Sequence, residues 1–208
     1  AVIVTYNRCE LLKRCINNIK KQSVTPQEIL VVNNGSKDNT VSMLSALNIK
    51  SINQDNIGSA GGWATGIEYA TKKGFDAIWL MDDDGYPDRF SLEKLLKASD
   101  KNTSCVSSIL VKENNIEEFV FPYPVINKEN KPALFSLPRK FSNKKDLLTN
   151  SKQNKYPFAH LFNGALISLK AVKKIGNVNK NYFIYGDELD YYYRLLEAGN
   201  VYSVLDCL

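Results

Sequence analysis

Short apolar runs and longer stretches with helical spacing alternate along the first hundred residues. The runs that predict buried strands are 2–4, 29–32 and 77–81, with a weaker strand over 50–53. Apolar residues three and four positions apart predict helices over 8–21, 41–47 and 58–73. Strands and helices in alternation, joined by short connections, require right-handed crossovers and a largely parallel sheet. The predicted fold class is therefore α/β, with a single domain over 1–208.

Residues 113–157 depart from this pattern. They contain five of the seven prolines, many Lys and Asn residues, and irregularly spaced apolar residues. We expect an insertion or long loop with one hairpin. Its role is either that of a lid over the acceptor or that of a variable surface excursion, and the sequence does not choose between the two. Periodicity returns with an apolar stretch over 161–169, helices over 170–175 and 188–198, and a final strand over 201–208.

Composition and charge limit the kinds of partner and the cellular compartment that we expect for this protein. With 44% apolar residues, the 208-residue chain can bury a core without disulfides. The formal net charge is +5, but the lysines are scattered, so we expect no nucleic-acid partner. The four cysteines lack metal-ligand spacing and predict free thiols in a reducing compartment. No apolar run approaches 18 residues and no signal peptide is visible, which predicts a cytoplasmic protein.

Polar clusters follow three of the predicted strands. They are Thr5-Tyr6-Asn7, Asn33-Asn34-Gly35 and Asp82-Asp83-Asp84. Ligands of open α/β sheets bind outside the carboxyl ends of the strands. We therefore expect the three clusters to meet at one edge of the sheet and to form the functional site.

The triple aspartate is the most specific indication of function in the sequence. Three consecutive carboxylates after a buried strand repel one another unless a positive charge lies among them. In an extended chain Asp82 and Asp84 point to one side and Asp83 to the other. Two carboxylates on one side suit Mg²⁺ or Mn²⁺, which leave positions open for phosphate oxygens. The alternative is an acidic turn that caps a helix, for which one aspartate would suffice.

A glycine-rich segment, Asn56 to Gly62, precedes the predicted helix over 58–73. Glycines let a ligand approach the backbone, and free N–H groups at a helix start attract anions. The segment has neither the Gly-Lys-Ser/Thr of a Walker loop nor the GxGxxG spacing of dinucleotide-binding folds. Its meaning therefore depends on its expected place beside the aspartates.

Three more carboxylates, Asp187, Glu188 and Asp190, stand at the start of the last predicted helix. Acidic residues there complement the helix dipole, which can by itself explain the cluster. Arg194 lies one turn after Asp190 and is expected to pair with it, leaving Asp187 and Glu188 as candidate general bases. The only histidine, His160, has apolar neighbours and is expected in the core, so neither a zinc site nor a Ser-His-Asp triad is supported.

Five segments, taken in order, resemble the inverting family 2 glycosyltransferases with the GT-A fold over nearly the whole chain. They are 2–8, 29–40, 56–63, 79–84, and 162–165 taken with 186–194. The third and fourth are most similar to the galactofuranosyl- and rhamnosyltransferase-like branch. The resemblance implies a Rossmann-like GT-A sandwich with a mostly parallel central sheet. In this reading 1–112 forms the nucleotide-sugar-binding half and 158–208 the acceptor and catalytic-base half.

The resemblance also implies a reaction and its setting. A sugar would move from a UDP- or dTDP-linked donor to a glycan or lipid-linked acceptor with inversion, in bacterial surface polysaccharide synthesis. The cofactor would be Mn²⁺ or Mg²⁺. Peripheral association with the inner face of the plasma membrane and a homodimer are the arrangements to test.

Individual roles follow from the matching positions. Asp82 and Asp84 would hold the metal ion, and Asn163 and Gly164 would contact the acceptor. Glu188 falls where the family has its base, with Asp187 one position before it. The donor would be bound by Thr5, Tyr6, Asn7, Asn33, Asn56, Gly58, Gly61, Gly62 and Asp83. Asn33 stands where the family usually has Asp, which changes the expected base preference. The family's histidine metal ligand follows the base by some twenty residues, so we expect it beyond Leu208, in a chain truncated at its C-terminal end.

Two other functions compete with this interpretation. A sugar-1-phosphate nucleotidyltransferase shares the sheet and the need for a metal ion, but its glycine-rich basic loop should follow the first strand, where Thr5-Tyr6-Asn7-Arg8 stands instead. A non-catalytic module that binds carbohydrate or nucleotide-sugar is the other alternative, and the carboxylates at both motifs disfavour it.

Overall fold

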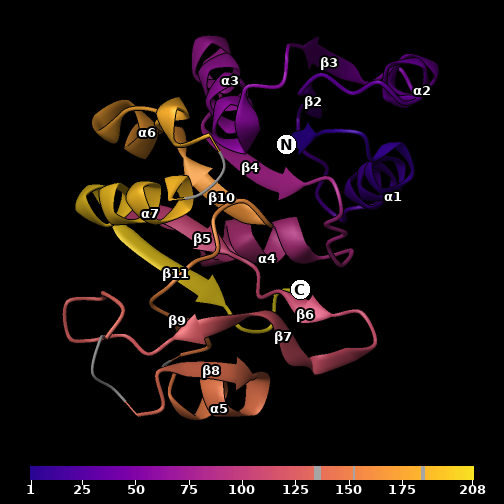
Figure 1. Cartoon of the computed structure of the whole chain (residues 1–208). Coiled ribbons are helices and arrows are strands. Elements are labelled where there is room, and N and C mark those ends of the chain that lie inside the picture. The colour runs from indigo at the N-terminus through magenta and orange to yellow at the C-terminus, as the bar shows by residue number, and fades with distance from the viewer. Residues whose placement is uncertain (134–136, 152, 184–185) are drawn as a thin grey trace.

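The computed structural model describes residues 1–133, 137–151, 153–183 and 186–208 and shows a layered α/β fold (Figure 1). Its central sheet has eight strands in the order β3-β2-β1-β4-β10-β5-β11-β9. The bounds are β1 (Val2–Thr5), β2 (Leu30–Asn33), β3 (Lys50–Asn53), β4 (Ala77–Asp82), β5 (Thr103–Ser107), β9 (Lys155–Tyr156), β10 (Ala165–Ser168) and β11 (Asn200–Val204). Strand β10 runs antiparallel to both its neighbours, and β9 is antiparallel to β11. The other pairs are parallel, which confirms the predicted fold class.

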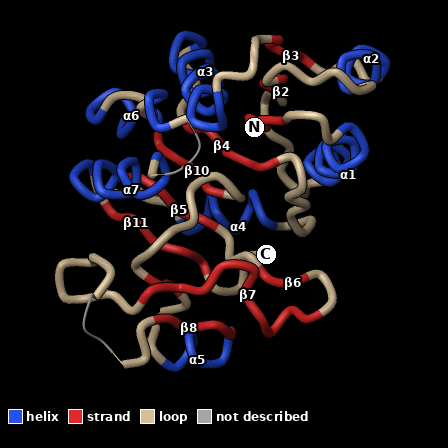
Figure 2. Tube along the Cα trace, viewed as in Figure 1, coloured by secondary structure: helices blue, strands red, loops and turns tan. Residues whose placement is uncertain are grey.

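Helices cover both faces of the sheet (Figure 2). Helices α3 (Gly58–Lys73), α6 (Leu169–Ile175) and α7 (Asp187–Ala198) pack on one face, and α1 (Cys9–Lys20), α2 (Thr40–Ala46) and α4 (Ser91–Ala98) pack on the other. A short 3-10 helix, η1, covers Lys180–Tyr182. The predicted helix over 58–73 and the weak strand over 50–53 match α3 and β3 at both ends. Among the described residues, no helix is both long and apolar enough to cross a membrane.

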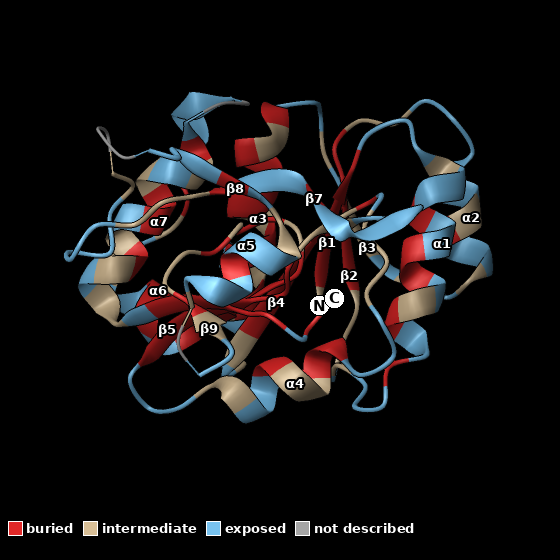
Figure 3. Ribbon diagram, turned by 90° about the horizontal axis from the view of Figure 1, so that it is seen from below, coloured by how far each residue is buried: buried red, intermediate tan, exposed pale blue. Residues whose placement is uncertain are grey.

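The buried strands divide their side chains between the two faces. Val2 and Val4 join the core cluster under α3, whereas Ile3 joins the cluster under α1 and α4. This alternation is what a strand covered on both sides produces, and it explains the continuous apolar runs in the sequence. Figure 3 shows the buried strands enclosed between partly exposed helices.

The segment that departed from the pattern contains most of a second, smaller sheet. Strands β6 (Val111–Lys112), β7 (Asn115–Pro124) and β8 (Lys140–Asn143) pair antiparallel, and α5 (Lys144–Thr149) packs beside them. The segment thus has more regular structure than the expected insertion or long loop with one hairpin. Both ladders contain register shifts, so the two-residue alternation that would announce the strands is broken.

The glycines of α3 and its ends have distinct structural tasks. Gly58 begins the helix with φ +79°, and a Cβ there would lie 2.1 Å from the carbonyl oxygen of Phe183. Gly74 ends the helix with φ +74°, and a Cβ there would meet nothing within 4 Å. Both positions favour glycine because of backbone conformation, but only Gly58 is also in close contact with another segment.

We predict that Gly58→Ala destabilises the protein more than Gly74→Ala. Gly74→Ala adds only the left-handed strain of an L-residue, about 1–2 kcal/mol. Gly58→Ala adds that strain and a clash with the Phe183 backbone, about 1–3 kcal/mol further. Urea denaturation of both variants measures the difference in free energy of unfolding, and equal losses would contradict the close approach.

Candidate functional site

The carboxyl ends of β1, β2 and β4 open onto a cavity of about 1030 Å³. Neighbouring positions in the sheet, β2-β1-β4-β10, bring their terminal residues together. Ten residues of the candidate site lie on the cavity wall, namely Thr5, Tyr6, Arg8, Asn34, Asn56, Gly58, Asp82, Asp83, Asp84 and Asn163. The three polar clusters predicted to meet at one sheet edge therefore do so.

The three aspartates have different partners. Strand β4 ends at Asp82, whose Oδ2 accepts a 2.8 Å hydrogen bond from Nδ2 of Asn163. Asp83 is buried and accepts a 2.8 Å hydrogen bond from the Thr5 hydroxyl. Nη1 of Arg8 lies 3.3 Å from Oδ1 of Asp83 and 2.9 Å from Oδ2 of Asp84.

The geometry corrects one step of the sequence argument. The chain turns at residues 83–84, so strand alternation does not extend past Asp82. Asp83 and Asp84 instead share one guanidinium, while Asp82 faces Asn163. Alternation therefore gives no reason to pair Asp82 with Asp84, and the prediction that both hold a metal ion rests on the cavity that they share.

The cluster carries uncompensated negative charge. Burial, followed by the charges of Asp84, Asp83 and Glu188, raises the pKa of Asp82 well above its usual range. Burial also raises the pKa of Asp83, although the Thr5 hydroxyl and Arg8 oppose it. Arg8 responds in the opposite sense, because the charge of Asp83 raises the pKa of its guanidinium. Arg8 thus neutralises part of the cluster and leaves Asp82 without a cation.

The site fits a cation that takes few ligands from the protein. Within the described residues, no group of three or more His, Cys, Asp and Glu side chains is arranged to hold a metal ion. Mg²⁺ and similar ions commonly take one or two carboxylates and complete their shell with phosphate oxygens and water. The carboxylates of Asp82 and Asp84 supply such oxygens, and the raised pKa of Asp82 shows where a cation would relieve repulsion.

Asn34, which the sequence argument did not single out, organises the part of the cavity wall between the end of β2 and the start of α3. Its Nδ2 donates to Oδ1 of Asn56 and to the carbonyl of Gly58, each at 3.0 Å. Its Oδ1 accepts from Nε2 of Gln54 at 2.9 Å and from the backbone N–H of Ile57 at 3.3 Å. One buried amide thus ties the end of β2 to the loop that begins α3. Only the strand register distinguishes Asn34 from its neighbour Asn33.

Several predicted donor residues take structural positions. Asn33 is buried and is not among the residues that line the cavity; its amide donates to Oδ1 of Asn53 and accepts from the N–H of Ser36. Asn7, at φ 56°, holds the same turn, because its Oδ1 accepts a 2.7 Å hydrogen bond from the N–H of Lys37. The resemblance assigned both to the donor, and that assignment stays a prediction.

Two glycines of α3 lie away from the cavity wall. A Cβ on Gly62 would lie 2.5 Å from Cγ1 of Val4, and one on Gly61 would lie 2.5 Å from Cγ1 of Ile57. Their small size therefore serves the close packing of α3 on its surroundings. Of the glycines predicted to contact the donor, Gly58 lines the cavity.

The acceptor side connects to the aspartates through one short segment, 160–163. Asn163 binds Asp82, and two residues earlier the N–H of Leu161 donates a 2.8 Å hydrogen bond to Oε1 of Glu188. Gly164, at φ +92°, donates its N–H to the carbonyl of Leu80 and so holds this segment beside β4.

The two candidate bases differ in their surroundings. Oδ2 of Asp187 is buried without a hydrogen-bond partner among the described residues, and burial raises the pKa of this carboxyl. Burial also raises the pKa of Glu188, but His160 and the N–H of Leu161 outweigh it and leave the pKa lowered. The predicted pair of Asp190 with Arg194 is confirmed, with Nε at 3.0 Å and Nη2 at 2.5 Å from Oδ2 of Asp190.

Comparison with known proteins gives consistent results. The profile of the family described as Glycosyl transferase family 2 matches residues 1–174. Galactofuranosyltransferase GlfT1 of Mycolicibacterium smegmatis is 29% identical over 96% of this chain, and that of Mycobacterium tuberculosis is also 29% identical over 96%. The chain spans 65% and 64% of the length of these two relatives.

Solved structures share the fold. A mannosyltransferase from Pyrobaculum calidifontis, in complex with GDP-Man and Mn²⁺, has a TM-score of 0.70 and 17% identity over 99% of this chain and 55% of its own. GalNAc-T7, with UDP, GalNAc and Mn²⁺, has a TM-score of 0.71 and 16% identity over 99% of this chain and 42% of its own. At these identities the likeness establishes the GT-A fold.

We predict that Asp82→Asn stabilises the metal-free protein at neutral pH. The raised pKa means that the folded state favours the protonated acid, so ionisation of Asp82 lowers the free energy of unfolding as the pH rises through the raised pKa. The amide keeps an acceptor for Asn163 without the charge, and we expect a gain on the order of 1 kcal/mol.

Urea denaturation between pH 4 and pH 8 measures this gain. It should be small at the acid end and grow with pH. Asp88→Asn, an exposed carboxylate of the same loop, is the matched control and should change little. A destabilised Asp82→Asn at pH 8 would contradict the electrostatic argument.

Proposed function

The chain belongs to the family 2 glycosyltransferases, and on that premise we propose that it moves a sugar from a UDP- or dTDP-linked donor to a glycan or lipid-linked acceptor, with inversion. The observation that carries this proposal is the shared cavity, in which Asn34, Asn56 and the aspartates lie on one wall. A nucleoside diphosphate needs polar groups for its base and ribose beside a site that can hold a cation for its phosphates. The cavity supplies both.

In this proposal the donor lies along the ends of β1, β2 and β4. Thr5, Tyr6 and Asn56 contact the nucleoside, and Gly58 lets the ribose or diphosphate approach the start of α3. Asp82 and Asp84 hold Mn²⁺ or Mg²⁺, and Asp83 stays with Thr5 and Arg8 on the side of the donor sugar. The cation, when bound, neutralises charge that develops on the leaving diphosphate.

The acceptor approaches from the side of Asn163 and Glu188. Glu188 accepts the proton of the acceptor hydroxyl, whose oxygen attacks the anomeric carbon from the face opposite the diphosphate. Attack from that face inverts the configuration. The lowered pKa of Glu188 supports this role, because the carboxyl is then ionised and able to accept a proton at neutral pH.

The relatives suggest a substrate class and a setting. Two of them are named galactofuranosyltransferases, so galactofuranose is the first donor sugar to test. Shorter matches, 29% identical over 50% of this chain, are a chondroitin synthase and a hyaluronan synthase of Pasteurella multocida. We propose a role in bacterial surface polysaccharide synthesis, at the inner face of the plasma membrane.

We predict that UDP or dTDP binds only in the presence of Mn²⁺ or Mg²⁺, and that Asp84→Ala abolishes this metal-dependent binding. Isothermal calorimetry with each nucleotide, with the metal ion and with EDTA, measures it. Asp76→Ala, an exposed carboxylate at the opposite end of β4 and not among the residues that line the cavity, is the control and should bind like the unmodified protein. Equal binding in EDTA would refute the metal role, and absence of binding under every condition would favour a non-catalytic module.

We predict that Glu188→Gln lowers the rate of transfer about 10²–10⁴-fold, the usual effect of a general base, while metal-dependent UDP binding is retained. Release of UDP from UDP-galactofuranose, compared with UDP-galactose, measures the rate. Asp187→Asn is the matched variant and should lose less than Glu188→Gln. The reverse order of the two losses would assign the base to Asp187.

A further inference from the structure

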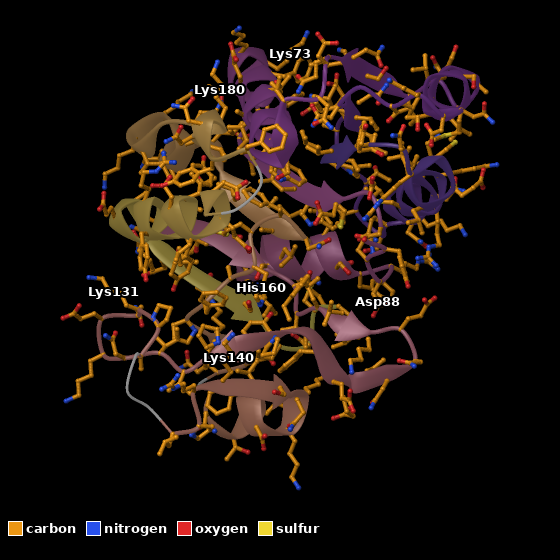
Figure 4. All side chains as sticks on the ribbon, in the orientation of Figure 1. Lys73, Asp88, Lys131, Lys140, His160 and Lys180 are labelled. Carbon is orange, nitrogen blue, oxygen red and sulfur yellow. The ribbon has the colours of Figure 1, made fainter. Side chains whose placement is uncertain are left out.

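The only histidine of the chain is His160, which is labelled in Figure 4. It lies against the proposed base, Glu188. Nδ1 of His160 is 3.7 Å from Oε1 of Glu188, an ion-pair distance rather than a hydrogen bond. The same oxygen accepts the hydrogen bond from Leu161. Both polar contacts thus converge on Oε1, and Oε2 receives no hydrogen bond from the described residues. The Glu188 side chain is 44% exposed.

Aromatic rings surround His160 on its other sides. Ring centroids lie 4.9 Å from Tyr123, 5.1 Å from Phe158 and 5.6 Å from Phe121. The side chain is 13% exposed, and its Nε2 is buried without a hydrogen-bond partner among the described residues. A buried polar atom without a hydrogen-bond partner destabilises the fold, so a purely apolar ring would suit this position better for packing alone. The imidazole is better explained by what its Nδ1 faces.

We propose that His160 is a positioning residue, which holds Oε1 of Glu188 and leaves Oε2 as the oxygen that accepts the proton of the acceptor hydroxyl. The inference rests on the proposed function, in which Glu188 is the base. In that step the acceptor O–H bond breaks and its proton passes to Oε2. The acceptor oxygen bonds to the anomeric carbon, and the bond from that carbon to the diphosphate oxygen breaks.

The second sheet takes part in this arrangement. Phe121, on β7, lines the cavity and also contacts the ring of His160. The imidazole therefore lies between a cavity-wall residue and the proposed base. A substrate that displaces Phe121 would disturb the His160 ring and, through it, the position of Glu188. In this way the 113–157 segment contacts the proposed base through a single intervening side chain.

Other ionisable side chains near Glu188 come from the strands and the helix around it. They are Asp82 at the end of β4, Asp187 on α7, Cys105 on β5 and Tyr123 on β7. Burial raises the pKa of Cys105 and of Tyr123, so both are neutral at neutral pH. The two aspartates carry the same sign as Glu188 and cannot lower its pKa. His160 is the neighbouring side chain that lowers the pKa of Glu188.

The test measures the carboxyl of Glu188 directly, without substrate. In protein labelled with ¹³C at the glutamate carboxyl carbon, the Glu188 signal is assigned by its loss in Glu188→Gln, and its pKa is followed by NMR. His160→Phe keeps an aromatic ring but removes Nδ1, and the pKa of Glu188 should rise. His160→Asn keeps a nearby donor and should give a smaller rise. An unchanged pKa in His160→Phe would overturn the proposal.

A second measurement decides the question even if His160→Phe fails to fold. Because the chain has one histidine, a ¹⁵N spectrum of the imidazole shows a single pair of nitrogen signals. Glu188→Gln should move the Nδ1 signal and leave the protein folded, since the amide oxygen can still accept from Leu161. Nitrogen signals that are identical with and without the carboxylate would show that the two groups are not coupled.

The failure of this inference and the failure of the proposed function are distinguishable. If Glu188→Gln keeps its rate of UDP release from UDP-galactofuranose, the base assignment fails, whatever the NMR shows. If Glu188→Gln loses the rate but His160→Phe keeps both the pKa of Glu188 and the pH dependence of the rate, only the role of His160 fails. Support requires that the acid limb of the His160→Phe profile moves to higher pH, with the donor KM within about twofold.

Discussion

Three carboxylates follow one another at the end of a buried strand, and their repulsion is the constraint on which the site depends. Each needs a partner within hydrogen-bonding distance, and no single neighbouring segment supplies them all. Asp83 takes Thr5 and Arg8 from the end of β1 and the start of α1, and Asp82 takes Asn163 from the approach to β10. The sheet order places β1 and β10 on either side of β4, so the segments next to these two strands supply the partners that the aspartates need. Compensation remains incomplete, and the raised pKa of Asp82 records where a cation is still needed.

The same arrangement couples the two sides of the proposed reaction. Segment 160–163 binds Asp82 through Asn163 and Glu188 through Leu161, and its geometry is held by the Gly164 N–H on β4. Donor-side and acceptor-side carboxylates are therefore positioned by one short piece of backbone. Glu188 is also close enough to Asp82 to raise its pKa, so a cation at Asp82 would change the electrostatic environment of Glu188 as well. In the proposed function, this proximity would link donor binding to the strength of Glu188 as a base.

Much of the fold followed from periodicity, and the failures have definite causes. Helix α3 and strand β3 were predicted to the residue because Gly74 ends one and turn residues bound the other. The second sheet was missed because register shifts interrupt its alternation. In the site, the convergence of strand ends could be predicted from topology alone. The partners of the aspartates could not, since Arg8 is placed by the turn after β1 and Asn163 by the segment before β10, and single-residue patterns encode neither placement.

His160 illustrates how far a sequence argument reaches. A lone histidine with apolar neighbours is expected in the core, but the structure places His160 at its border, partly buried among the rings of Tyr123, Phe158 and the exposed Phe121. Packing alone does not explain a histidine at this position, because one ring nitrogen faces Glu188 and the other has no hydrogen-bond partner among the described residues. A partly buried ionisable pair is weak support for stability, since desolvation opposes the attraction between its charges. The pair is better explained by the orientation of Glu188, which the charge cluster around Asp82 would otherwise repel from the site.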